Sequence, residues 1–282
     1  TNWEIVSVNP VDKNWDWKDM FCFWSVGLQS IMSFALIASL YFVYNFNFYE
    51  VFFGSLLASL LVSYLSYIIG KPSQKHGIPF PVFLRVSSGY QGAKFISLIR
   101  GVVGIFFFGV QTYFISRSIG YLIRISLFQI DSELLNNDIF FNYFMTMNLI
   151  DWISFVFTIL IQYFLFSRGQ KFIRNFINFS ALFVYLGLLL FFVVLIADPE
   201  LFVMETFISK LNLESGFTDF QLKNMIGITG TLFAYFSILI MNFGDYSRYV
   251  KSNDNLIKGN LSLIINFILL SIFAIFIVLG AD

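Results

Sequence analysis

Seven long apolar stretches divide this chain, and each is about as long as a membrane-spanning helix. They cover residues 20–44, 48–69, 95–117, 146–167, 176–197, 225–243 and 259–281. An α-helix needs about 20 apolar residues to cross the hydrocarbon core of a bilayer, which is about 30 Å thick. The sequence therefore predicts an all-α polytopic membrane protein with about seven transmembrane helices.

Positive charge is divided unequally between the two sides of these stretches. The N-terminal segment and the connections after the second, fourth and sixth stretches, with the adjoining ends of the stretches, hold 13 of the 17 Lys and Arg residues, and the opposite side holds 4. Because cytoplasmic loops carry an excess of Lys and Arg, this division places the N-terminus of a multi-pass membrane protein in the cytoplasm. On the opposite side, Arg117 is either an interfacial anchor or a cation near the outer mouth of a substrate path.

Composition and ionisable residues exclude several classes of protein. A hydrophobic fraction of 58% with 12% charged residues excludes an ordinary soluble domain. Cys22 is the only cysteine, and the only histidine, His76, lies in a connection, so neither an internal disulfide nor a metal cluster is expected. No Asp or Glu lies in the central part of any stretch. We therefore expect no enzyme, no cofactor and no nucleic-acid partner.

The two ends of the sequence favour a fragment of a longer protein. The chain does not begin with Met, and it stops at Asp282 directly after an apolar run. We expect residues 1–282 to form a single transmembrane domain from which the C-terminal helices are missing.

The polar residues inside the stretches are neutral amides. They are Gln29, Gln111, Gln162, Asn242 and Asn266. Such amides hydrogen-bond either a neutral polar ligand or a neighbouring helix, and we assign the second role to Gln162 and Asn266. Phe107 lies one turn before Gln111 on the same helix face, so a ring and an amide point together. A flat heterocycle would stack on the ring and be read by the amide, but the residues alone leave that role open.

Small residues mark the helix contacts and the interruptions. Ser55, Ser59 and Ser63 form a small-residue ridge in the second stretch, which predicts close packing and a scaffold role. Glycines interrupt the first and sixth stretches, at Gly27 and at Gly227 with Gly230. Interrupted helices at corresponding places in two repeats are the sequence signal of a transporter's binding site.

The connection 70–94 contains Pro79, Pro81 and several apolar residues, so we expect it to pack at the cytoplasmic surface rather than to form a solvated loop. This connection and three other segments resemble the first nucleobase–cation symporter family, which includes bacterial hydantoin, uracil and allantoin permeases. The matching residues are Gly77-Ile78-Pro79-Phe80-Pro81-Val82 with Arg85, Gly89-Tyr90-Gln91-Gly92-Ala93, Arg100-Gly101 with Phe108-Gly109-Val110-Gln111-Thr112, Asn14-Trp15-Asp16-Trp17 with Phe23-Trp24, and Asn242-Phe243-Gly244-Asp245-Tyr246-Ser247-Arg248-Tyr249.

The resemblance implies the LeuT-type fold, a transporter of two five-helix inverted repeats, here truncated to about seven transmembrane helices. It implies that Gln111 hydrogen-bonds the heterocycle and that Phe107 and Phe236 stack on it, where hydantoin permeases have Trp. It implies Gln29 as a further polar contact and the carbonyl of Tyr235 at a break in the sixth helix. Because both stacking rings are Phe, a pyrimidine or a small hydantoin-like metabolite fits better than a bulky aryl-hydantoin.

The coupling ion is Na⁺ or H⁺. In sodium-coupled relatives, carbonyls of the first helix and hydroxyls of the eighth hold the ion, and Ser25 and Leu28 align with the carbonyl donors. Proton-coupled carriers commonly use an intramembrane acid, and the seven stretches hold none in their centres, so Na⁺ is favoured. The sequence thus predicts a symporter that imports a nucleobase-like heterocycle, the alternative being a non-transporting membrane sensor or structural subunit on the same scaffold.

Overall fold

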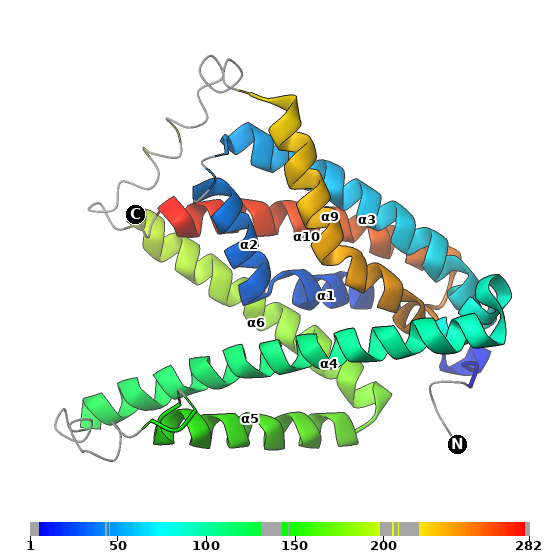
Figure 1. Cartoon of the computed structure of the whole chain (residues 1–282), viewed down its shortest axis with the longest axis horizontal. Coiled ribbons are helices and arrows are strands. Elements are labelled where there is room, and N and C mark those ends of the chain that lie inside the picture. Colours follow the sequence, from blue (N-terminus) through cyan, green and yellow to red (C-terminus); the bar gives the residue numbers. More distant parts are fainter. Residues whose placement is uncertain are drawn as a thin grey trace. The chain divides into compact units, whose positions relative to one another are not determined.

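A computed structural model describes residues 6–42, 44, 46–130, 143–145, 147–197, 205, 208 and 220–279. In these residues the chain is helical and forms no extended strand (Figure 1). After a short 3₁₀ turn at Pro10–Asp12, the helices are α1 (Trp17–Leu28), α2 (Ile31–Phe42), α3 (Phe48–His76), α4 (Phe80–Ile130), α5 (Leu149–Ser167), α6 (Gln170–Ala197), α9 (Leu222–Ser247) and α10 (Asn253–Leu279).

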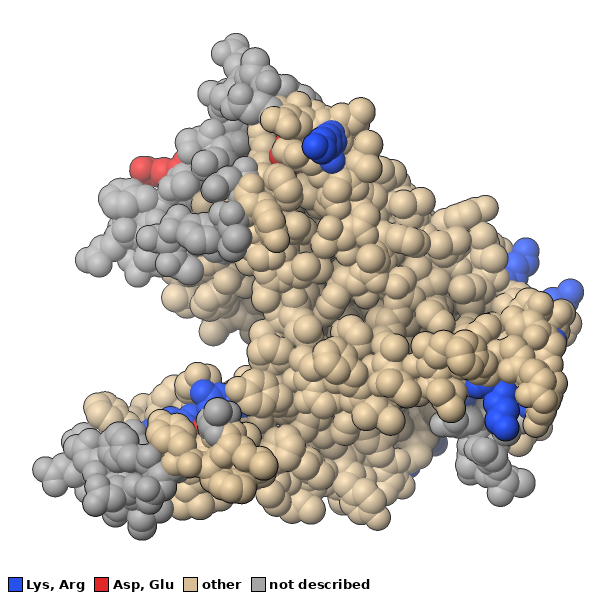
Figure 2. All heavy atoms as spheres, in the orientation of Figure 1, with Lys and Arg blue, Asp and Glu red and all other residues tan. Residues whose placement is uncertain are grey.

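The helices reproduce the seven predicted spans. Among the described residues, six helices are each long and apolar enough to cross a membrane, and α1 with α2 makes a seventh, bent by 61° at a short break. The face of the molecule in Figure 2 is largely uncharged, and its Lys and Arg residues lie in small groups. The predicted class, an all-α polytopic membrane protein, is confirmed.

The chain forms two compact units. One contains residues 1–90 and 176–282, and the other contains residues 91–175. Each unit is described by itself below, and the single domain expected from the sequence stays a prediction.

In the larger unit, α3 and α9 pack side by side at unusually close range. A Cβ added at Gly54 would lie 2.7 Å from the side chain of Ile228, and one added at Gly70 would meet the ring of Phe243. Hydroxyl groups of α9 reach the glycine carbonyls: Ser247 Oγ donates to Gly70 O at 3.0 Å. Such close approach is possible only where one helix presents small residues.

The serine ridge of α3 is buried, as predicted for a scaffold. Ser55 and Ser59 are almost inaccessible, and Ser63 Oγ donates to the carbonyl of Asn260 on α10 at 3.1 Å. α10 in turn packs on α1, where Gly259 leaves room for Met20. The second span is therefore the element on which α9 and α10 assemble, and α1 joins this group through α10.

A buried carboxylate joins the N-terminal ends of α3 and α9. Glu50 is 1% exposed, and its oxygens accept from the backbone N–H of Asn47 at 3.0 Å, the backbone N–H of Gln221 at 2.6 Å and the side chain of Asn224 at 3.1 Å. Negative charge is stabilised at helix N-termini, and α9 has no side-chain cap of its own. Glu50 thus caps two parallel helices at once.

The opposite ends of these helices meet the N-terminal segment. Val8 N–H donates to the carbonyl of Gly77 at 2.9 Å, and Trp15 N–H donates to the carbonyl of Tyr249 at 3.0 Å. Lys13 Nζ donates to a carbonyl in the last turn of α3, and partial burial lowers the pKa of this amine. The N-terminal segment, the end of α3 and the α9–α10 connection therefore share one end of the unit.

The connection between α3 and α4 is packed rather than solvated, as predicted. α3 ends at Gly77, whose φ of 69° requires glycine, and α4 begins at Phe80, which is 4% exposed. Asp245 Oδ1 accepts from the backbone N–H of Phe80 at 2.9 Å. Gly89, with φ 65° and ψ −176°, interrupts α4 one residue before the boundary between the two units.

These contacts bring together three of the four segments that the charge pattern assigns to one side. The segments rich in Lys and Arg before α1, after α3 and after α9 lie together, and Asn178 near the start of α6 donates to Asp19 near the start of α1 at 2.7 Å. Glu50 and Gln221 lie at the other ends of α3 and α9.

We predict that Gly70→Ala lowers the stability of the protein, because the added methyl group would overlap the Phe243 ring in the α3–α9 contact. Overpacking of this kind costs about 1–3 kcal/mol. The melting temperature of the purified protein in detergent measures the effect. Gly187→Ala on α6 is the control, since no described atom lies within 4 Å of its added Cβ. Equal melting temperatures for the two variants would contradict the close contact.

Candidate functional site

The break between α1 and α2 falls on Gln29 and Ser30, where the resemblance places a polar substrate contact. Gln29 is 8% exposed, and its Nε2 donates to the backbone carbonyl of Asn266 at 3.1 Å. Because a carbonyl only accepts, the amide nitrogen must face Asn266 and the oxygen must face away. Gln29 Oε1 has no hydrogen-bond partner among the described residues. The break thus holds a buried acceptor without a donor.

The carbonyls assigned to a cation lie at the same break. Ser25 O accepts from Gln29 N–H at 2.9 Å, and Leu28 O accepts from Ser30 N–H at 2.8 Å. A carbonyl oxygen has two lone pairs, so each retains one for a cation. Ser25 Oγ is also buried, and it lies beside the hydroxyl of Tyr185. The described residues hold no cluster of three or more His, Cys, Asp or Glu, so a metal here would need neutral oxygen ligands.

Asn266 has the structural role predicted for it. Its Nδ2 donates to the carbonyl of Ser262 at 2.8 Å, its Oδ1 accepts from the hydroxyl of Tyr185 on α6, and its carbonyl holds Gln29. Sequence reasoning missed Tyr185, because a tyrosine in an apolar stretch gives no sign of its partner.

Phe236 lies in the core of the larger unit, 1% exposed. Its ring contacts Phe267 edge-on at a centroid distance of 4.8 Å and Tyr235 at 4.9 Å. Since Gln29 contacts Asn266 and Phe236 contacts Phe267, two of the predicted site residues converge on one turn of α10.

The prediction of a break in the sixth helix is wrong. α9 is a continuous helix from Leu222 to Ser247, although it contains Gly227 and Gly230. The glycines permit a break but do not require one. The hydroxyl of Thr231 donates to the carbonyl of Gly227, one turn earlier in the helix, at 2.9 Å. The carbonyl of Tyr235 therefore lies within a continuous helix rather than at a break, and its contact with a substrate stays a prediction.

Phe107 and Gln111 belong to the smaller unit, where both are half-buried on α4. The Phe107 ring contacts Phe106 edge-on at 5.8 Å, and no bond of the Gln111 amide occurs within the described part of this unit. Gln162 on α5 donates to Thr112, the neighbour of Gln111, at 3.1 Å, which confirms its helix–helix role. The convergence of Gln111 and Phe107 with Gln29 and Phe236 stays a prediction.

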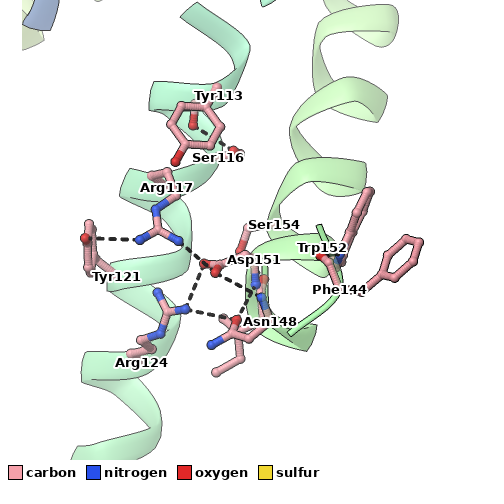
Figure 3. A network of polar contacts seen from close by, with 11 residues as sticks. Tyr113, Ser116, Arg117, Tyr121, Arg124, Phe144, Asn148, Asp151, Trp152 and Ser154 are labelled. Carbon is pink, nitrogen blue, oxygen red and sulfur yellow. Dashed lines mark hydrogen bonds and ion pairs between the residues drawn. The ribbon is translucent and has the colours of Figure 1, made fainter. Parts of the chain in front are cut away.

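Sequence reasoning also missed a charged network in the smaller unit (Figure 3). Asp151, 1% exposed, bonds Arg117 on one oxygen and Arg124 on the other, each at 2.7 Å. Two signals pointed to it: arginines seven residues apart share a helix face, and Asp151 lies in the first turn of α5 after Asn148, its N-cap.

Comparison with known proteins gives a family. The family model described as "Permease for cytosine/purines, uracil, thiamine, allantoin" matches residues 7–282. The chain is 24% identical over 261 residues to "Allantoin permease" of Bacillus subtilis (strain 168), covering 92% of this chain and 51% of that protein. It is 23% identical over 270 residues to "Purine-uracil permease NCS1" of Arabidopsis thaliana, covering 93% of this chain and 42% of that protein.

The chain thus spans about half the length of the curated relatives it matches. No solved structure matches it significantly. The matched family and the named relatives are transporters rather than enzymes, in agreement with the sequence analysis. The chain belongs to the family of permeases for cytosine/purines, uracil, thiamine and allantoin.

Proposed function

We propose that this chain is part of a secondary symporter that imports a neutral, nucleobase-like heterocycle of the pyrimidine, allantoin or hydantoin type. The observation that carries the proposal is the family match over residues 7–282. The names of the relatives, an allantoin permease and a purine-uracil permease, favour the same substrate class.

The site residues suit such a ligand. Gln29 Oε1 is a buried acceptor, so it favours a substrate with a ring or ureide N–H at that edge. In the smaller unit, Gln111 offers both a donor and an acceptor, and the half-buried ring of Phe107 offers a stacking face. The ring of Phe236 packs on two neighbouring aromatic rings and is 1% exposed, so it would contact a ligand only after a rearrangement. The side chains expected at the site are neutral in each unit taken by itself, which matches a neutral ligand, since an isolated buried charge would be costly.

Transport by this protein uses binding and conformational exchange without covalent chemistry. The break between α1 and α2 gives the first span two halves that end at the site, as in transporters with discontinuous helices. Hydrogen bonds to the substrate replace those that its polar groups make with water.

Sodium is the coupling ion in this proposal. The carbonyls of Ser25 and Leu28, with the hydroxyl of Ser25, offer oxygen ligands at the helix break, where the C-terminal end of α1 also favours a cation. Three acids in the described spans are buried. Asp151 bonds two arginines, Glu50 bonds backbone and amide donors at a helix end, and Asp19 accepts from a side-chain amide of α6 and from a backbone N–H at the start of α1. None of the three has the position of a mid-membrane proton relay.

The proposed location is the inner (plasma) membrane with a cytoplasmic N-terminus. This orientation follows from the excess of Lys and Arg at the end where the N-terminal segment meets Gly77 and Tyr249.

Gln111→Ala is predicted to weaken binding of uracil or allantoin about ten- to a hundredfold, since unpaired polar groups cost about 1–3 kcal/mol. Phe107→Ala has a comparable effect through lost stacking, and Phe107→Trp is tolerated. Isothermal titration of the purified protein measures the affinity. Gln162→Ala is the matched control, because its amide bonds Thr112, and it lowers only the stability. If Gln162→Ala abolished binding and Gln111→Ala did not, the site would be wrongly placed.

Sodium is predicted to tighten substrate binding at constant pH. Titrations in sodium chloride and in choline chloride, compared at equal ionic strength, measure this coupling. An affinity that is independent of sodium but rises with acidification would show proton coupling instead.

Cysteine labelling tests the orientation. Two single-cysteine variants are made in a Cys22→Ser background. His76→Cys places an exposed thiol at the C-terminal end of α3, and Lys223→Cys places one at the N-terminal end of α9, which is the opposite end of this helix pair. A membrane-impermeant maleimide added to intact cells should label Lys223→Cys and spare His76→Cys until the cells are opened. The reverse pattern would invert the topology.

A further inference from the structure

The charged network between α4 and α5 is a built site. Arg117 and Arg124 lie two turns apart on α4, and their guanidinium groups converge on the two oxygens of Asp151 (Figure 3). Asn148 Oδ1 accepts from Arg124 Nη2 at 3.0 Å and also caps the backbone of Asp151. A Cβ at position 120 would lie 3.3 Å from Asp151 Oδ1, so Gly120 provides the space for the carboxylate.

The charges of this network do not balance within the described residues. Two guanidinium groups face one carboxylate, and both oxygens of that carboxylate are already used. The N-terminus of α5 begins at the same place and adds positive potential. The net positive charge is partly open to the surroundings, because the side chains of Arg117 and Arg124 are 29% and 23% exposed.

Unused donors accompany the unmatched charge. A guanidinium has five N–H donors, and Arg117 spends one on Asp151 and one on a long contact of 3.5 Å to the hydroxyl of Tyr121. The Tyr121 ring lies beside both guanidinium groups, at 5.5 Å and 5.6 Å, and holds them on one face of α4. The arrangement is a forked pair of arginines with donors left for a second oxyanion.

The site lies where a membrane provides such an anion. It is at the end of the third and fourth spans, and the exposed rings of Tyr113 and Tyr121 beside it are typical of the aromatic belt at headgroup level. Exposed apolar residues continue away from it on both helices, among them Ile105 and Phe106 on α4 and Ile153 and Val156 on α5.

We propose that Arg117 and Arg124 bind a phosphate oxyanion, with Asp151 fixing the two guanidinium groups in place. A guanidinium fork matches two phosphate oxygens, and the bound anion neutralises the charge that Asp151 leaves unmatched. The phosphate comes from a phospholipid headgroup or from free phosphate.

The melting temperature of the purified protein in detergent tests the site. One arm adds phosphatidylglycerol against phosphatidylcholine, and a second adds inorganic phosphate against chloride at equal ionic strength. A rise in the first arm alone identifies a lipid phosphate, and a rise in both identifies phosphate in general. Arg117→Gln leaves one arginine for one aspartate, so it should reduce the apparent affinity for phosphate about tenfold or more. Arg117→Lys, which keeps the positive charge, should retain most of that affinity.

A second variant separates an anion site from a structural ion pair by the direction in which it changes the response of the melting temperature to phosphate. Asp151→Asn raises the net charge, so it should increase the response to phosphate although the protein without ligand is less stable. Arg168→Gln, at the other end of α5, should respond as the unmodified protein does. The proposal is overturned if no phosphate compound raises the melting temperature, or if Arg117→Gln keeps the full response. It is also overturned if a response appears only after Asp131, Glu133 and Asp138 in the neighbouring connection are neutralised, since the chain's own acids would then fill the site.

Discussion

Close contact between α3 and α9 is the constraint on which the larger unit depends. Inside a bilayer, burying apolar surface gives no preference for another helix over lipid, so association rests on tight packing and polar contacts. Glycines allow the tight packing along the α3–α9 seam. Polar contacts lie near its two ends: at one, Glu50 of α3 bonds Gln221, and at the other, Ser247 of α9 bonds the carbonyl of Gly70. α10 joins the same seam through Ser63, and α1 follows α10. The break in the first span is thereby held against a rigid group of helices.

That rigid group fixes what the break offers to a ligand. The amide of Gln29 has only one orientation that hydrogen-bonds the carbonyl of Asn266, and this orientation leaves its oxygen as an acceptor. Asn266 is fixed in turn by Tyr185 and by its own helix. The polar character of the site on this unit thus follows from helix packing, without any charged residue.

Patterns carried by many residues were predictable from the sequence, and pairings between single residues were not. Seven apolar stretches and the division of Lys and Arg gave the spans and their alternation, because length and charge sorting are properties of whole segments. Gln162 and Asn266 were correctly assigned to helix contacts. The prediction of a break at Gly227 and Gly230 was wrong, since glycine permits an interruption of a helix without requiring one. Asp151 and Tyr185 were missed because their partners lie on other helices, 27 and 81 residues away.

Uptake against a gradient is the most direct test of the central claim that this chain serves a symporter. Radiolabelled uracil and allantoin would be offered to proteoliposomes that contain the full-length protein and carry an inward sodium gradient. The account predicts that at least one of them accumulates inside above its external concentration and leaks out when an ionophore collapses the gradient. Binding without accumulation of either compound would contradict it and favour a sensor or structural subunit on the same helical scaffold.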